Sequence, residues 1–103
     1  MNEIIDITYK QRELVLRQAD ILYQNVPDSV KVEMYQEIFY TESLERDEIR
    51  KVKESFLGEK AVIEELSIIN NYTNKYEAII KDHFNHYQEG LKQEITESNN
   101  VLS

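Results

Sequence analysis

Apolar residues recur every three or four positions along residues 60–97, and this stripe constrains the fold more than any other feature of the chain. It consists of Val62, Leu66, Ile69, Tyr72, Tyr76, Ile80, Phe84, Tyr87, Leu91 and Ile95. These ten residues span 33 positions in nine steps, about 3.7 residues per step. That spacing is close to the ~3.6-residue period of an α-helix and longer than the ~3.5 of a coiled coil. It predicts a nearly straight helix that packs in a bundle.

The width of the stripe changes along its length. It is broad between residues 61 and 80 and narrows to a single line beyond Phe84, which predicts packing on two sides and then on one. Its middle contains a polar run at 70–74, where Asn and Thr favour caps and turns over helix interiors. Two interpretations remain open: a break near 70–74, or one helix that continues through the run.

Composition favours helices throughout. The chain has 103 residues, enough for one domain with one core, and its 2 glycines and 1 proline are too few for the turns of a β-rich fold. We therefore predict a single all-α domain over 1–103, an antiparallel bundle of about four helices. The alternative is an elongated helical hairpin that dimerises, because a thin hairpin cannot bury such wide stripes alone.

The predicted helices cover about 3–25, 30–42, 44–70 and 75–97, followed by a frayed tail at 98–103. Pro27 ends the first helix, because proline lacks an amide hydrogen and disfavours helical angles at Val26. Gly58 has two interpretations. It is either the glycine that ends a helix, which would divide 44–70, or a glycine inside a helix that continues.

Net charge is −8, from 20 acidic and 12 basic residues, so we expect no direct binding to nucleic acid and none to an anionic membrane surface. The chain has no cysteine, which excludes disulfides and thiolate metal sites. Its start lacks the pattern of a signal peptide, and no uncharged run approaches the ~20 residues of a membrane helix. We expect a soluble, cytoplasmic protein.

Two histidines are the first candidate metal ligands. His83 and His86 lie three positions apart, within reach of each other on a helix, with Asp82 beside them. Di-metal helical bundles use Glu-x-x-His on two helices. Here Ile80 occupies the position three before His83, and the chain has no second histidine pair. Solvated polar residues are the better interpretation.

Paired carboxylates are the second candidate. Glu45 and Glu48 have the spacing of one magnesium-binding pair in a helical hydrolase, and Glu64 and Glu65 could add further acids. A second pair at the same spacing beside Asp82 is absent, and acids are abundant enough to produce such coincidences. We predict no catalytic residue, no metal ligand, no cofactor and no enzymatic activity. A metal-dependent hydrolase is the least favoured alternative.

Aromatic residues around position 37 indicate a contact surface. The segment carries more apolar side chains than one core contact requires, and such side chains dominate protein–protein hot spots. We predict that Met34, Tyr35, Phe39 and Tyr40 bind a protein partner or a second copy; the alternative is a short helix that is buried all round.

The predicted function is a non-enzymatic adaptor, inhibitor or antitoxin-like regulator of one protein partner. A second candidate is an acidic mimic of nucleic acid, which would need one face free of Lys and Arg.

Overall fold

The computed structural model describes the backbone of residues 3–102 and the side chains of residues 3–96. Three helices make up this part of the chain: α1 (Glu3–Leu22), α2 (Asp28–Ser55) and α3 (Gly58–Leu102). The all-helical prediction is therefore confirmed, whereas the prediction of about four helices is wrong. The molecule is a rod with extents of 68 × 21 × 18 Å.

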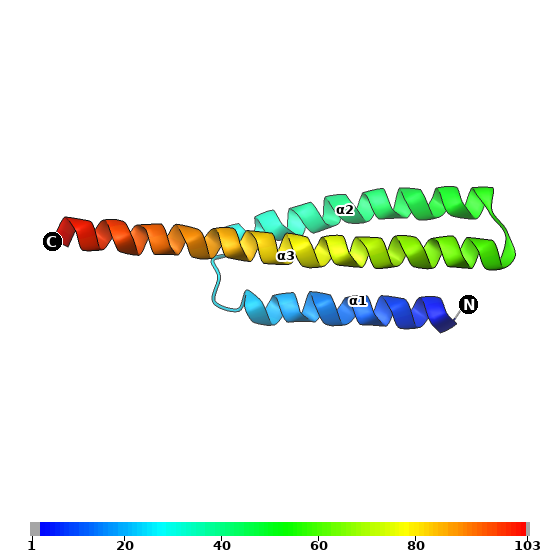
Figure 1. Ribbon diagram of the computed structural model, residues 1–103, viewed down its shortest axis with the longest axis horizontal. Coiled ribbons are helices and arrows are strands. Elements are labelled where there is room, and N and C mark those ends of the chain that lie inside the picture. The colour runs from blue at the N-terminus through cyan, green and yellow to red at the C-terminus, as the bar shows by residue number, and fades with distance from the viewer. Residues whose placement is uncertain (1–2, 103) are drawn as a thin grey trace.

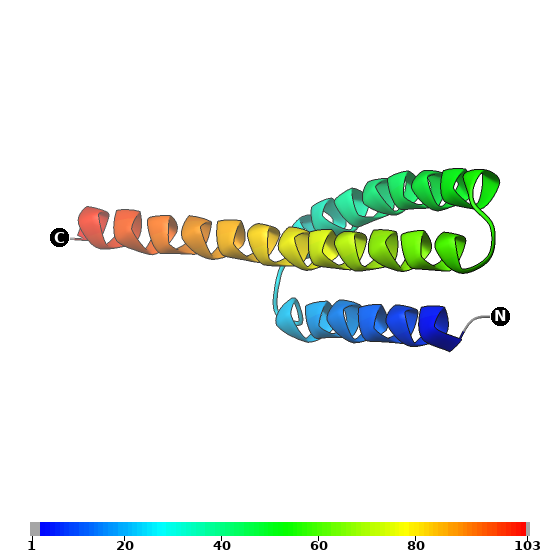
Figure 2. The ribbon, with the colours of Figure 1, turned by 45° about the vertical axis from the view of Figure 1, so that its right-hand side comes forward.

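α3 is the central helix, and α1 and α2 pack against it. Figures 1 and 2 show that α2 runs antiparallel to both α1 and α3. The last part of α3 extends past the α1–α2 connection with no helix beside it (Figure 1). We call residues 88–102 of α3 the projection; its residues 88–96 are all exposed.

The two connections follow local chain chemistry. α1 ends at Leu22, three residues earlier than predicted, and a turn in which Val26 N donates to Tyr23 O leads to Pro27 and the start of α2. Of the two interpretations of Gly58, the structure has the division of the helix: α2 ends at Ser55, and Gly58, with a φ of +63°, is the first residue of α3. Glycine adopts this left-handed conformation without the steric cost that a Cβ would add.

Two predicted breaks do not exist. The predicted helix 30–42 and the first part of the predicted helix 44–70 form one helix, α2, in which Ser43 Oγ donates to Tyr40 O at 2.6 Å. α3 continues through 70–74, where Tyr72 is buried and Thr73 Oγ1 donates to Ile69 O at 2.8 Å. α3 also includes 98–102, where a frayed tail was predicted, and Ser103 lies outside the described residues.

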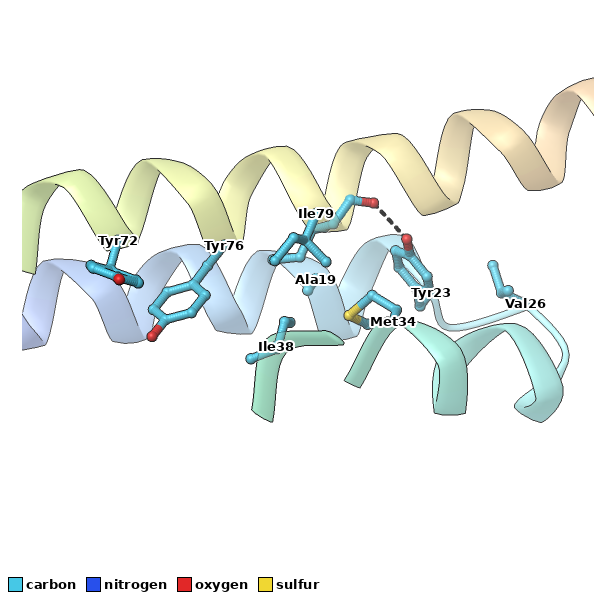
Figure 3. Close-up of a cluster of buried hydrophobic side chains, with 9 residues drawn as sticks. Ala19, Tyr23, Val26, Met34, Ile38, Tyr72, Tyr76 and Ile79 are labelled. Carbon is cyan, nitrogen blue, oxygen red and sulfur yellow. Dashed lines mark hydrogen bonds between the residues drawn. The ribbon is translucent and has the colours of Figure 1, made fainter. Parts of the chain in front are cut away.

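The hydrophobic core lies where all three helices meet. Figure 3 shows Ala19 from α1, Tyr23 from the turn after it, Met34 and Ile38 from α2, and Tyr72, Tyr76 and Ile79 from α3 pointing toward one another. Tyr23 also donates its hydroxyl hydrogen to Ile80 O, so its polar atom is satisfied inside the core (Figure 3). Within 3–102 no helix combines the length and apolarity that crossing a membrane requires. Cytoplasmic localisation stays a prediction.

Candidate partner-binding surface

The four residues predicted to contact a partner are divided between the core and the surface. Met34 is fully buried, at 0% exposure, and packs in the core, so it is not available to a partner in this structure. Phe39 and Tyr40 are 62% and 67% exposed, and Tyr35 is partly buried. The alternative of a short helix buried all round is therefore excluded by the exposure of these two aromatics.

Three side chains form one continuous apolar surface on the outer side of α2. Tyr35 and Phe39 stack with ring centroids 6.4 Å apart and an interplanar angle of 26°. Val32 lies seven positions before Phe39, nearly two helical turns away on the same side, and is 51% exposed. We call Val32, Tyr35 and Phe39 the α2 surface. Tyr40 lies about 100° around the helix from Phe39, so it belongs to a separate flank.

Tyr35 is held in place by α1. Its hydroxyl donates to Asp20 Oδ1 at 2.6 Å across the two helices. This hydrogen bond, together with burial, raises the pKa of Tyr35 to about 12, because ionising the hydroxyl would remove the donor and place a second negative charge beside Asp20. The ring that supports Phe39 therefore has a fixed orientation, which lowers the entropy cost of using this surface in binding.

The same side of α2 becomes basic toward its C-terminal end. Val32, Phe39, Arg46 and Lys53 follow one another at intervals of seven residues. Arg46, Arg50 and Lys53 line a hollow of about 460 Å³ together with Tyr9 and Ile49, and Glu54 and Glu65 complete its wall. Asp47 lies 3.6 Å from Arg50, and Glu65 lies 3.7 Å from Lys53. The apolar surface is thus followed by a charged region in which three basic side chains lie among three acidic ones, Asp47, Glu54 and Glu65.

A buried polar network fixes how the helices that carry this surface sit. Arg12 from α1 donates from Nη1 to Glu45 Oε1 at 2.8 Å and from Nη2 to Glu45 Oε2. It also donates from Nε to Thr73 Oγ1 and from Nη2 to Ile69 O, both at 3.0 Å. Tyr76 donates to Glu45 Oε1 at 2.8 Å. One ion pair therefore joins all three helices.

This network was not predicted from the sequence. The signal that could have revealed it is the position of Arg12 three residues before Val15, on the apolar face of the first helix. Arg12 and Glu45 are 9% and 4% exposed, and buried charges of this kind persist only when they are paired and hydrogen-bonded. Glu45 raises the pKa of Tyr76, after the larger effect of burial.

Three of the four carboxylates considered for a magnesium site are used in other ways. Glu45 is paired with Arg12, and Glu65 is buried beside Lys53. Glu48 accepts a hydrogen bond from Tyr72, which, after the larger effect of burial, helps raise the pKa of Tyr72 to about 12. A carboxylate that already neutralises a cation is a poor ligand for a second one.

The histidines lie beside acids of α2. His83 Nε2 donates to Glu37 Oε2, and both line a hollow of about 330 Å³ with Glu33, Asp82 and His86. No three His, Cys, Asp or Glu side chains within residues 3–96 are placed so that they could hold one metal ion.

Basic residues occur in each of the three described helices. The nucleic-acid mimic stays an alternative prediction. No family model, curated protein or solved structure matches this chain.

Proposed function

We propose that this chain is a non-enzymatic protein-binding module, of the adaptor, inhibitor or antitoxin type, that binds one protein partner through the α2 surface. The observation that carries the proposal is the division of α2 into two apolar sides. Met34 and Ile38 already fill the core at 0% and 2% exposure, while Phe39 and Val32 stay 62% and 51% exposed beside Tyr35. The outer side is therefore not needed to bury the core.

Exposed aromatics of this kind favour association. Removing apolar area from water stabilises a complex by about 25 cal/mol per Å², and large rings with few rotatable bonds lose little entropy when they bind. Among the side chains of residues 3–96, thirteen large hydrophobics are exposed and ten hydrophobics are buried. An excess of this size is expected of a chain that completes its packing with another molecule.

The two parts of the outer side of α2 suggest the chemistry of the partner. Val32, Tyr35 and Phe39 suit apolar side chains, and the hollow lined by Arg46 and Arg50 suits carboxylates that follow them. The proposed partner therefore presents an amphipathic segment, apolar at one end and acidic at the other. Binding to such a segment should weaken as salt is raised, because the charges that contribute to it lie at the surface.

The test is affinity capture from an extract of the native host with three forms of the protein. Wild type and Ile21→Ala should retain the same partner, because Ile21 is 73% exposed on α1 and lies outside the α2 surface. Val32→Ala/Phe39→Ala should lose it while its circular dichroism and thermal midpoint stay unchanged. Retention by the double variant, or no protein specific to the wild type, would contradict the proposal.

A further inference from the structure

The projection carries an apolar stripe that continues from the core and is covered by nothing in the described chain. Phe84 and Tyr87 pack against the core cluster, and Leu91 and Ile95 follow on the same face of α3 with 40% and 61% exposure. Nearer the N-terminus of α3, α1 packs against this same face. Arg12 of α1 donates to Thr73, and Tyr23 packs against Phe84 with ring centroids 5.7 Å apart. The position beside α3 that α1 fills is therefore empty along the projection.

We infer that a second copy of this chain fills that position, with the two projections packed antiparallel about a two-fold axis that crosses the stripe at Ile95, the middle of residues 88–102. Ile95 of one copy then lies against Ile95 of the other, with the Leu91 of each copy one helical turn to either side. Residues 88–102 are about 22 Å long at ~1.5 Å per residue. Two such helices bury on the order of 1,000 Å² in total, the lower limit for a specific interface.

Only the antiparallel direction avoids a steric clash. In a parallel pair that used the same face, the α1 of each copy would occupy the space required by the α3 of the other. An antiparallel pair places the two three-helix bodies at opposite ends. It also separates their charge, because residues 84–97 hold three acids and one base, a net charge of −2 out of −8. The remaining −6 of each copy lies at the far ends, which lowers the repulsion between them.

The occupant has to be a helix with an uncharged stripe of the same spacing and length, and the projection itself meets this requirement. Phe84, Tyr87, Gln88, Leu91 and Ile95 lie on or beside the contact face, and none of them is charged. Glu89, Lys92 and Glu94 point away from the centre of this face, and Lys92 Nζ lies 3.9 Å from Glu89 Oε1 within one chain. This self-association goes beyond the proposed function and uses a different surface.

The test combines mass and shape measurements on the full chain. Sedimentation equilibrium should give twice the 12.3 kDa of one chain as concentration rises. Small-angle scattering of that dimer should give a maximum dimension of about 110 Å, because two 68 Å rods overlap over about 22 Å. A chain that stays monomeric at the highest attainable concentration, or a dimer no longer than a single rod, overturns the inference.

Two double variants assign the interface. Leu91→Glu/Ile95→Glu should raise the dimer Kd by about 100-fold or more, because it places four carboxylates in the apolar contact, while the helix content of the monomer is retained. Gln93→Glu/Thr96→Glu adds the same charge on the opposite face of the projection and should change the Kd by less than about threefold. Equal effects of the two variants would contradict the assigned face. If the wild type were monomeric, the proposal that the α2 surface binds a partner would still stand, and its capture test would be unchanged.

Discussion

The two halves of α3 carry the same apolar stripe but have different surroundings. In the enclosed half of α3, up to Tyr87, the stripe is buried or half-buried, with Ile69 and Tyr76 at 0% exposure between α1 and α2. From residue 88 onward the spacing is unchanged, yet Leu91 and Ile95 are exposed. The apolar periodicity of a helix therefore determines which of its faces can be buried. Whether that face is buried depends on the presence of a neighbouring helix. The first half packs against α1 and α2, and the second half is exposed over its described side chains, residues 88–96.

The largest expected effect comes from the ion pair that joins the enclosed half to its neighbours. Glu45→Ala should lower the free energy of unfolding by about 3–5 kcal/mol, because Arg12 would be left buried without a counter-charge. Urea denaturation measures this. The double variant Arg12→Met/Glu45→Leu removes both charges and should recover most of the loss. If it were as unstable as the single variant, packing and not charge would be the cause.

Substitutions on the core side of α2 should lower the free energy of unfolding more than substitutions on its outer side. Met34→Ala should cost about 2–5 kcal/mol, because it leaves a cavity in a fully buried site. Phe39→Ala, five positions along the same helix, should change stability by less than about 0.5 kcal/mol because its ring is exposed. Thermal unfolding followed by circular dichroism compares the two variants. Similar losses would show that Phe39 contributes to the fold and would weaken its proposed role in binding.

Alkaline pH should destabilise the enclosed half through its tyrosines. The pKa of Tyr72 is raised from 10.0 to about 12 by burial and by its hydrogen bond to Glu48. The unfolded chain therefore loses this proton at lower pH than the folded one, so the contribution of Tyr72 to the free energy of unfolding is constant well below pH 10 and falls between about pH 10 and pH 12. Tyr72→Phe should show a shallower fall in urea titrations over this range. An identical fall would assign the dependence to other groups.

The smallest effects on the free energy of unfolding are expected from substitutions in the projection. Ile95→Ala should leave the unfolding free energy of the dilute protein within about 0.5 kcal/mol of wild type, because Ile95 makes no core contact in a single chain. Chemical denaturation at low concentration measures it. At high concentration the same change should destabilise the protein by a larger amount, since folding and dimerisation are then linked. A large loss at low concentration would mean that the projection stabilises the monomer.

The parts of the fold that local chemistry determines were predictable from the sequence. The stripe spacing predicted the helix, and Gly58 marked the turn where a positive φ is required. Both predicted breaks that are absent lie at or near a polar residue that binds Arg12. Thr73 lies within the run at 70–74, and Glu45 lies two positions after the break predicted at residue 43. From the sequence alone such polar residues predict a loop, because the arginine that they bind lies 33 or 61 positions away along the chain.

The contact surface was predicted only in part for a related reason. An excess of apolar residues in α2 was visible, but assigning each of them to the core or to the outside requires the direction of the neighbouring helices. The predicted site therefore grouped Met34 with Phe39 and did not include Val32, although the seven-residue spacing from Val32 to Phe39 places these two on a common side. The exposed end of the stripe was predicted to pack on one side and packs on none within this chain.

Amide hydrogen exchange, resolved by residue and measured at several protein concentrations, tests the contrast between the two halves of α3 most directly. We expect slow exchange around Ile69 and Tyr76 at every concentration, because opening there requires global unfolding. Around Leu91 and Ile95 we expect fast exchange in dilute solution that becomes slower as concentration rises. Exchange in the projection that is equally slow at all concentrations, or equally fast at all of them, would contradict the account.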